Sequence, residues 1–423
     1  MKTAMKILSI LLAAVLLLSL TACGNTQNTG GSSSDTSNSS VEQPSSEESS
    51  SVEEPSSEAE SSSEDTSSKT PTGTAIGKDE VKSTIWTGKV ASKVAKGAGT
   101  KEYPYYIYTA DEFAYALTTG GKQGHYYQLM ADIYLNDVSN KDWMLNKNNN
   151  AWFTDISFSS HLDGNGHCVY GVWINPAEVP KAGGLITYFS GGSITNLGVR
   201  SSFIIATDFA GGIVGKANTG TVKEFKNCFV DETVYVWLDE STGSDVGAGG
   251  ILGHALECGS SEAQITFENC YSKVQLRSDT AESYRLNGII GIIYKSAYTM
   301  KNCYSVGYDP YYSNGENWTS LLLKNGYKSS DVFVNVYGTK NTASSLRKQY
   351  WTKVSESSIK GSGAKSAMSG LDFNKVWETV DGATPKLRVF KGIDGKTSSA
   401  TPISEISLAG FETPVVVGKP EKQ

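Results

Sequence analysis

A short glycine phrase returns at intervals along the middle of this chain, and its period limits the folds that the chain can adopt. A first, shorter form is GGLI at residues 183–186. The phrase then occurs as GGIVG at residues 211–215, GGILG at residues 249–253 and NGIIG at residues 287–291. Between successive phrases an asparagine precedes a hydrophobic residue. These asparagines are Asn196, Asn227, Asn269 and Asn302, and the steps between them are 31, 42 and 33 residues. Repeats of this length are typical of solenoids, propellers and arrays.

The content of each repeat favours a β-helix among these architectures. Short runs of β-branched and aromatic residues are separated by glycine, and no amphipathic pattern is long enough for a crossover helix. Steps of 31 and 33 residues are too short for a propeller blade, which needs roughly 40 to 45 residues. We therefore predict an all-β fold in which strands stack rung upon rung.

Glycine and asparagine are expected to form the corners of this coil. Glycines of the repeated phrase, such as Gly212 and Gly250, are predicted at bends with positive φ. Asparagine also tolerates the left-handed region, and its amide can bond to the asparagine one rung away. The four ladder asparagines are therefore interpreted as structural.

The alternation of GGIVG or GGILG with NCF or NCY resembles the GLUG-type repeats of β-helical surface proteins from anaerobic and gut bacteria. The resemblance covers residues 86–390, including the phrase FSSHLDGNGHCVYGVWI at residues 158–174 and a closing segment at residues 373–390. It implies a right-handed parallel β-helix. It implies little about function, because that family is defined by its coil and not by a chemistry.

The first 23 residues are predicted to be a lipoprotein signal. Lys2 and Lys6 precede an apolar run over residues 7–20, which is short for a membrane span and fits a secretory signal peptide at residues 1–22. The run ends in LTAC, which resembles the bacterial lipobox and makes Cys23 the lipid-attachment site. An ordinary signal peptide with an incidental Cys23 is the alternative. Because two acyl chains hold a protein on a membrane, we predict anchoring at the extracellular face of the cell membrane.

An acidic, serine-rich segment follows the lipid site. Between residues 24 and 70 ten acidic residues are balanced by Lys69 alone, so residues 23–75 are predicted to be a disordered, extended tether. This segment contributes −9 and the signal region +2, which together give the net charge of −7, so residues 71–423 are neutral. A neutral body without a basic cluster argues against a nucleic-acid partner.

The β-helix is predicted to span residues 76–392. Thr109 and Glu112 have the spacing of a capping box, which predicts a short helix that caps the N-terminal end of the coil. Strands are expected at residues 126–130, 133–135, 156–158, 169–174 and 332–337, with a turn at residues 163–166. Residues 305–370 are expected to hold longer loops and degenerate rungs. Residues 393–423 are expected to form a linker and the opening strands of an incomplete further module.

Three cysteines, Cys228, Cys270 and Cys303, directly follow ladder asparagines. Stacked positions about 4.8 Å apart would allow disulfide or metal contact. The chain has no C-x-x-C, and an odd number of cysteines remains after Cys23, so a stacked column of small core residues is the preferred interpretation.

The histidines provide no recognisable metal site. His161 and His167 flank Asp163, but their spacing fits no zinc pattern. His125 and His254 have no evident partners, so they are interpreted as surface residues or as core residues with satisfied hydrogen bonds.

Charged residues form one column along the repeats and a set of acids in the loops. The third residue after each ladder position gives a mixed column, Arg200, Asp231, Lys273 and Val306, which is interpreted as a solvated face. No cofactor is expected. Acids in the loops before the glycine phrases leave a stacked calcium site as an alternative to solvated loop tips, and these are Asp208, Asp239, Glu240 and Glu282.

Aromatic residues offer a route to glycan binding, because aromatic rings stack on sugar faces. The candidate glycan-contact residues are Tyr308, Tyr311, Tyr312 and Trp318. The preferred function is a non-catalytic, adhesin-like module that contacts a glycan or a surface protein. The alternatives are a carbohydrate-active β-helical enzyme, similar to polysaccharide lyases or glycoside hydrolases, and a structural stalk. Carboxylates and a basic residue converging across neighbouring rungs would favour the enzyme.

Overall fold

The computed structural model describes residues 84–122, 124–218, 221–239, 246–256, 264–279, 286–294, 297–307, 311–312, 320–322, 332–339, 351–396 and 400–409. These residues belong to one compact unit, Thr74–Gln423. The predicted signal peptide, Cys23 and the tether lie outside the described residues. The signal peptide, the lipid attachment and the disorder of the tether therefore stay predictions. Among the described residues, no helix is long and apolar enough to cross a membrane.

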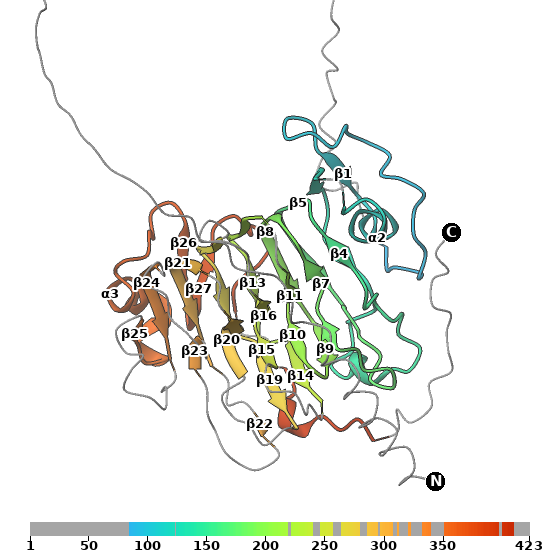
Figure 1. Ribbon diagram of the computed structural model, residues 1–423. Helices are drawn as coiled ribbons and strands as arrows, with labels where there is room; N and C mark the ends of the chain where they lie inside the picture. The colour runs from blue at the N-terminus through green and yellow to red at the C-terminus, as the bar shows by residue number, and fades with distance from the viewer. Residues whose placement is uncertain are drawn as a thin grey trace, which may run out of the picture. The chain divides into compact units, whose positions relative to one another are not determined.

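The described chain forms a right-handed parallel β-helix, which confirms the predicted fold class. Its strands stack side by side along the coil (Figure 1). The first sheet is built from β1 (Tyr105–Ile107), β2 (Tyr126–Leu129), β3 (Ile133–Tyr134), β5 (His161–Tyr170), β8 (Gly192–Arg200), β12 (Lys223–Lys226), β13 (Phe229–Val230), β17 (Gln264–Glu268), β18 (Tyr271–Ser272), β21 (Ala297–Ser305), β24 (Val332–Gly338) and β25 (Thr352–Lys353).

Two further parallel sheets complete each turn of the coil. The second contains β4 (Ser157–Phe158), β6 (Ala182–Gly183), β7 (Ile186–Phe189), β10 (Phe209–Gly211), β11 (Val214–Ala217), β15 (Gly247–Gly249), β16 (Leu252–Leu256), β20 (Leu286–Tyr294) and β23 (Ser320–Leu322). The third contains β9 (Ser202–Ala206), β14 (Val234–Leu238), β19 (Gln275–Ser278) and β22 (Tyr311–Tyr312). A chain that leaves β8 therefore passes through β9, β10 and β11 before it returns to the first sheet at β12.

Side chains at matching positions stack inside the coil. Ile194, Phe225 and Phe267 are in register on β8, β12 and β17, and the two phenylalanine rings are parallel with centroids 4.7 Å apart. Burial of such columns removes apolar surface from water at every rung, by about 25 cal/mol per Å². The coil is therefore stabilised between neighbouring rungs and needs no single central core.

Left-handed backbone occurs at the ladder asparagines. Asn196, Asn227, Asn269 and Asn302 have φ between 51° and 54°. The amide of Asn227 donates to Oδ1 of Asn196 at 2.8 Å, and that of Asn269 donates to Oδ1 of Asn227 at 3.0 Å. Asn335 has the same φ and donates to Asn302 at 2.9 Å, so the ladder continues into β24.

The glycine phrase has a different role from the predicted one. Gly212 and Gly250 do not have positive φ. A Cβ on Gly212 would instead overlap the carbonyl oxygen of Gly250, and a Cβ on Gly250 would overlap Ser272 and the carbonyl oxygen of Gly288. Close approach of successive rungs, and not a left-handed bend, therefore requires glycine here.

A short helix caps the N-terminal end of the coil, as predicted. In α2 (Ala110–Thr118), Oγ1 of the N-cap Thr109 accepts from the Glu112 amide at 3.2 Å. Phe113, Ala114 and Leu117 are buried in the cluster that fills the coil. The helix therefore covers apolar side chains that an open rung would expose.

Three other local predictions can be compared with the structure. The predicted turn at residues 163–166 lies within β5, where Asn165 and Gly166 have φ of 51° and 81° and the register with β8 shifts. The strand expected at residues 332–337 is β24. Residues 402–406 are not the predicted strand: Ile403–Glu405 form the 3-10 helix η6, and Ile403 and Ile406 are buried. Residues 410–423 lie outside the described part of the chain.

The C-terminal region covers the outer side of the first sheet. It contains η4 (Ser357–Ile359), η5 (Gly361–Gly363), α3 (Ala364–Ala367) and the antiparallel pair β26 (Trp377–Val380) and β27 (Ala383–Leu387). Phe229, Tyr271 and Tyr304 form a stacked outward column with centroids 4.9 and 5.1 Å apart. Trp377 and Phe390 pack on this column, so these aromatic rings are buried and do not form an open platform.

Candidate functional site

A lateral cavity lies at the corner where the first sheet gives way to the third. Its volume is about 370 Å³, within the usual range for small-ligand sites. The lining combines hydroxyl, amide and cationic groups with aromatic and apolar surface. It consists of Tyr134, Val138, Ser139, Asn140, Lys141, Trp143, Met144, Tyr170, Arg200, Ser201, Thr233, Tyr235 and Ala400.

One column of the coil supplies three of these side chains. Tyr134 is in register with Tyr170, and Tyr170 is in register with Arg200. The two tyrosine rings are parallel with centroids 4.6 Å apart. The Arg200 guanidinium lies 5.7 Å from the Tyr170 centroid, and its Nη1 donates to the Tyr170 hydroxyl at 3.5 Å. The stacking of rungs therefore orders this wall of the cavity.

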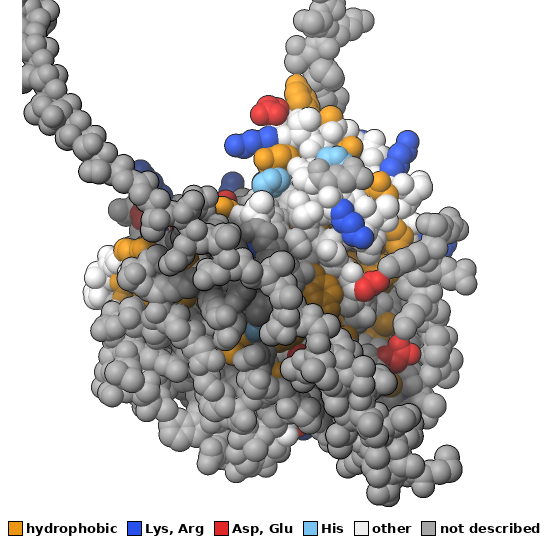
Figure 2. Space-filling view, in the orientation of Figure 1, with side chains coloured by type: hydrophobic (Ala, Val, Ile, Leu, Met, Phe, Trp, Pro, Cys, Tyr) orange, Lys and Arg blue, Asp and Glu red, His pale blue; other side chains and the backbone are white. Residues whose placement is uncertain are grey.

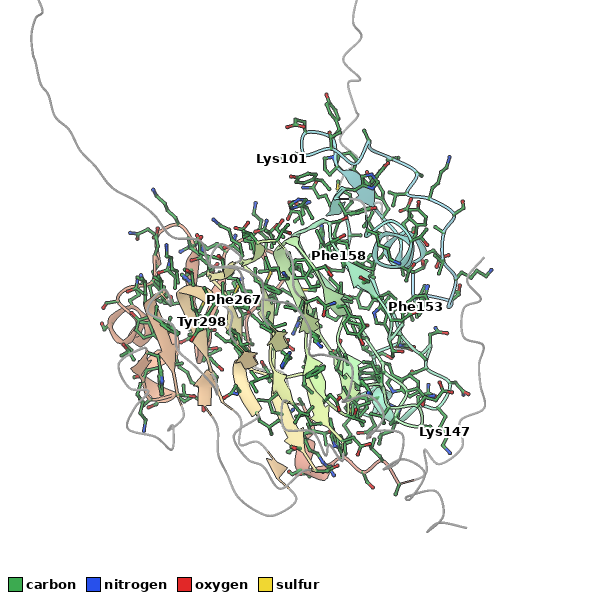
Figure 3. All side chains as sticks on the ribbon, viewed as in Figure 1. Lys101, Lys147, Phe153, Phe158, Phe267 and Tyr298 are labelled. Atoms are coloured by element: carbon green, nitrogen blue, oxygen red, sulfur yellow. The ribbon has the colours of Figure 1, made fainter. Side chains whose placement is uncertain are left out.

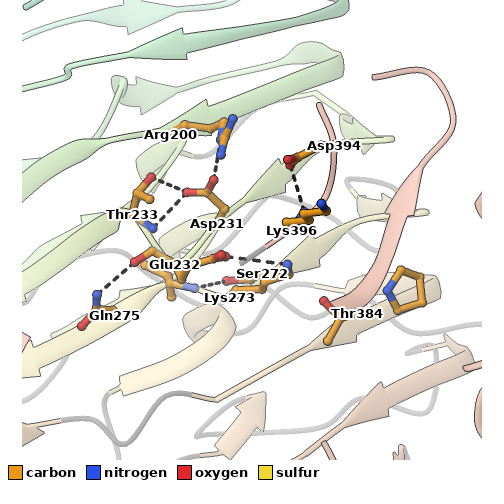
Figure 4. A network of polar contacts seen from close by, with 12 residues as sticks. Arg200, Asp231, Glu232, Thr233, Ser272, Lys273, Gln275, Thr384, Asp394 and Lys396 are labelled. Carbon is orange, nitrogen blue, oxygen red and sulfur yellow. Dashed lines mark hydrogen bonds and ion pairs between the residues drawn. The ribbon is translucent and has the colours of Figure 1, made fainter. Parts of the chain in front are cut away.

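The next rung adds an anion that fixes Arg200. Nε of Arg200 forms an ion pair with Oδ2 of Asp231 (Figure 4). Oδ1 of Asp231 accepts from the Thr233 amide at 3.0 Å and from its hydroxyl at 2.5 Å. The Thr233 hydroxyl in turn accepts from the Ser201 amide at 2.6 Å. Ser201 has φ of 41°, a conformation that is uncommon outside glycine, asparagine and aspartate.

A second charged pair lies beside this network. Nζ of Lys273 lies 3.7 Å from Oε2 of Glu232, and the two side chains are 6% and 3% exposed. Nε2 of Gln275 donates to the Glu232 carbonyl at 2.9 Å. Figure 4 shows the two acids pointing to partners on adjacent rungs. Carboxylates and basic residues thus converge across neighbouring rungs.

The prediction that this column is a solvated face was wrong. Asp231, Lys273 and Val306 are buried, and Arg200 is largely buried. Val306 packs in an outer cluster with side chains from residues 354–393. The C-terminal region that covers the sheet was not recognisable as a cover from the repeat alone.

Protonation states at the cavity follow from this burial. Desolvation is the largest single effect on the pKa of Arg200 and lowers it, but the charge of Asp231, its hydrogen bond to Arg200 and the nearby Tyr170 together raise the pKa by more, so the net shift is upward. Burial raises the pKa of Tyr170, and it raises that of Tyr235 to about 12. Near neutral pH the guanidinium is therefore charged and both phenols carry their protons.

Only Asp208 and Asp239 of the candidate calcium residues belong to the described part of the chain, so the stacked site stays a prediction. Oδ1 of Asp208 accepts from the Thr207 hydroxyl at 2.9 Å, and the Asp239 amide donates to the Ala206 carbonyl at 3.0 Å. Glu240 and Glu282 lie outside the described residues. No group of three or more His, Cys, Asp or Glu side chains suited to a metal occurs among those described.

The candidate glycan residues cannot be placed as a group. Tyr308 and Trp318 lie outside the described residues. Tyr311 and Tyr312 form β22, whose backbone pairs with β19.

The cysteines of the ladder column are buried. Cys228, Cys270 and Cys303 are free thiols and fully buried. Burial raises the pKa of Cys228 and Cys270, which keeps both as unreactive thiols. They act as small core residues.

The histidines have separate environments. Nδ1 of His161 lies 2.9 Å from the Ser193 hydroxyl, and Nδ1 of His167 lies 3.2 Å from Oδ1 of Asp132. His254 is 1% exposed, and neither ring nitrogen has a hydrogen-bond partner among the residues that the structure describes. The interpretation of His254 as a surface or satisfied core residue was therefore wrong. Its ring packs against Phe209, with centroids 4.4 Å apart.

Sequence reasoning did not bring the cavity-lining residues together, and it placed Arg200 on a solvated face. Tyr134, Tyr170 and Arg200 are a column only once the register of β3, β5 and β8 is known. It also missed Asp163, whose Oδ1 accepts from the Asn196 amide at 2.9 Å and begins the ladder. The motif DGNG contains this residue but indicated only a turn.

Comparisons with known proteins give partial likenesses. No family model matches the chain. A stretch covering 32% of the chain is 26% identical over 142 residues to Halomucin from Haloquadratum walsbyi, and it spans 2% of the length of that protein. The solved structure of a candidate immunoglobulin A1 protease from Bacteroides ovatus aligns with 70% of this chain and 95% of its own, at 17% identity and a TM-score of 0.35.

Proposed function

We propose that this chain is a cell-surface lipoprotein whose β-helix binds a saccharide in the lateral cavity. The lipobox-like LTAC at residues 20–23 and the acidic segment behind it support anchoring and display. The GLUG-type phrases support the same setting by resemblance. Display on a tether suits a module that meets a ligand outside the cell.

The observation that carries the saccharide proposal is the composition of the cavity wall. Hydroxyl, amide and guanidinium groups from β3, β5, β8, β14 and the loop at residues 135–149 surround one space. A saccharide presents many hydroxyl groups and needs several directed donors and acceptors. Arg200 and Thr233 are held in place by Asp231 before any ligand arrives, which lowers the ordering cost of binding.

The visible surface of the described residues carries charges of both signs (Figure 2). Figure 2 shows lysines, arginines, acids and histidines interspersed there, with no extended patch of one sign. Such a surface does not steer a polyanion such as nucleic acid.

A glycan array probed with the lipid-free protein tests this proposal. The variants Asn140→Ala and Lys141→Ala remove exposed groups at the cavity rim. Each is expected to weaken binding of an array hit about 5- to 30-fold, since a hydrogen bond to a ligand is worth about 1–2 kcal/mol. Lys147→Ala is the matched control, because Lys147 projects from the same loop without lining the cavity (Figure 3). Binding that the rim variants leave unchanged would place the ligand elsewhere.

A carbohydrate-active enzyme is the second candidate, and one observation favours it. Asp231 and Glu232 converge with Arg200 and Lys273 across neighbouring rungs. Against this candidate, Asp231 is 5% exposed, Glu232 is 2% exposed, and both are paired. A general acid or base must reach the proton that it transfers.

Each array hit is therefore incubated with the protein and checked for new reducing ends, which would overturn a purely binding role. A structural stalk is the remaining alternative, and it predicts that the protein binds no glycan on the array.

A further inference from the structure

Residues 400–409 lie against the third sheet, far from it in sequence. Ile403 and Ile406 are 3% and 5% exposed, and both belong to the hydrophobic cluster that fills the coil. Ala400 and Leu408 pack at its margin. Two aliphatic side chains three residues apart thus anchor the segment in the body of the protein.

The side chain of Gln275, on β19, both accepts a hydrogen bond from the backbone of this segment and donates one to it. Its Oε1 accepts from the Ile403 amide at 2.8 Å, and its Nε2 donates to the Thr401 carbonyl at 3.2 Å. A carbonyl and an amide two residues apart are the groups that a neighbouring strand would bond. Gln275 is 5% exposed and is itself fixed by its bond to the Glu232 carbonyl.

Two further side chains bind backbone carbonyls. The Tyr235 hydroxyl donates to the Thr401 carbonyl at 2.8 Å, and Nη1 of Arg277 donates to the Ile406 carbonyl at 2.9 Å. Arg277 lies 3.4 Å from the Trp237 ring centroid and pairs with Asp279 at 3.0 Å. Asp279 also accepts from Nε1 of Trp237 at 2.7 Å. The guanidinium is therefore positioned by Asp279 beside its own strand and by Trp237 on the preceding rung.

We propose that Tyr235, Gln275 and Arg277 form a peptide-binding site. It takes a short peptide with aliphatic side chains at positions i and i+3, and its resident ligand is residues 400–406 of the same chain. The hydrogen bonds described above reach only backbone groups of that segment, so the two isoleucines supply the side-chain selectivity. The proposal is independent of saccharide binding, although Tyr235 and Ala400 also line the cavity.

The test uses the full chain. The double variant Ile403→Asp, Ile406→Asp is expected to release the resident segment, because two carboxylates cannot remain buried without partners. Hydrogen exchange at residues 401–406 measures this release. A fluorescein-labelled peptide ATPISEISLA, which copies residues 400–409, is then added, and its anisotropy is followed. We expect saturable binding to the double variant and at least tenfold weaker binding to the wild type, whose site is occupied at a high effective concentration.

Matched controls locate the site. Adding Gln275→Ala to the double variant should weaken peptide binding at least tenfold, and the isosteric Gln275→Glu, which keeps an acceptor but loses the donor, should also weaken it. Lys226→Ala, on the first sheet, should leave binding unchanged. Thermal melting checks that every variant is folded.

Three results would overturn the proposal. These are continued protection of residues 401–406 in the double variant, no peptide binding once they are released, and peptide binding that Gln275→Ala and Gln275→Glu leave unchanged.

Discussion

Asparagine occupies the left-handed corner of successive rungs because two physical needs coincide there. The backbone requires φ near +50°, which asparagine tolerates better than other residues with a side chain. The side-chain amide can also donate to the rung before and accept from the rung after. Asn227 does both, with Asn196 and Asn269.

Replacing Asn227 separates these two contributions. Asn227→Ala removes both amide bonds and places a Cβ-bearing residue at φ of 52°, so we expect a loss of about 2–4 kcal/mol in the free energy of unfolding. Asn227→Gly keeps the backbone conformation and should lose about half as much. Urea denaturation of the two variants measures the difference. Equal stability of Asn227→Ala and wild type would contradict the role of the ladder.

His254 makes the fold sensitive to acid. Burial, with a smaller contribution from the positive charge of nearby Lys216, lowers its pKa to about 3. Between the unfolded value near 6.5 and about 3, the unfolded chain binds a proton that the folded chain excludes. Stability should therefore fall as pH drops through this window, by up to about 1.4 kcal/mol per pH unit.

His254→Leu isolates this effect from that of the carboxylates. The urea midpoints of wild type and variant are compared at pH 7 and pH 4.5. We expect the wild type to lose about 2–3 kcal/mol more than the variant over this change. Parallel losses in the two proteins would show that His254 does not titrate in this way.

At the scale of the strands, the glycine phrase allows β10, β15 and the rungs beside them to approach. Gly212 and Gly250 face neighbouring backbone with no room for a Cβ. Hydrophobic residues follow them, and Ile213, Val214, Ile251 and Leu252 are fully buried. Each phrase thus combines close backbone contact with core filling.

Gly212→Ala tests this close approach. The added methyl group would overlap the Gly250 carbonyl oxygen and lie against Val230, so we expect a loss of about 3 kcal/mol or a failure to fold. Gly392→Ala is the control, since nothing lies within 4 Å of a Cβ there, and it should change stability by less than about 0.5 kcal/mol. Melting temperature and soluble yield are the measurements.

At the scale of the whole molecule, one side of the coil is covered by other parts of the chain and another side is open to solvent. Its outer aromatic column is covered by the C-terminal region, whereas the lateral cavity at the adjoining corner is open to solvent. Long-range packing from residues 351–409 thus decides which part of the surface is left for a ligand.

The proposed anchoring belongs to this scale and is tested by Cys23→Ser. Without the thiol no diacylglycerol can be attached, and a tether rich in acid and serine has no affinity for lipid. We expect the variant to move from the membrane fraction to the medium when expressed in a lipoprotein-processing bacterium. Retention of the variant in the membrane fraction would contradict the lipoprotein assignment.

The sequence by itself determined the coil, the left-handed asparagine corners and the capping helix. The capping helix and the asparagine corners depend on local preference, and the coil depends on a period that survives insertions. Only the tertiary structure decided that Arg200 and Asp231 are buried, that Tyr134 and Tyr170 stack beside a cavity, and that Gln275 binds the segment near Ile403. These contacts join residues 30 to 130 positions apart. They depend on the register between strands and on the packing of the C-terminal region, whose sequence does not contain the repeat. The period therefore predicts the scaffold, whereas packing between distant segments creates the candidate sites.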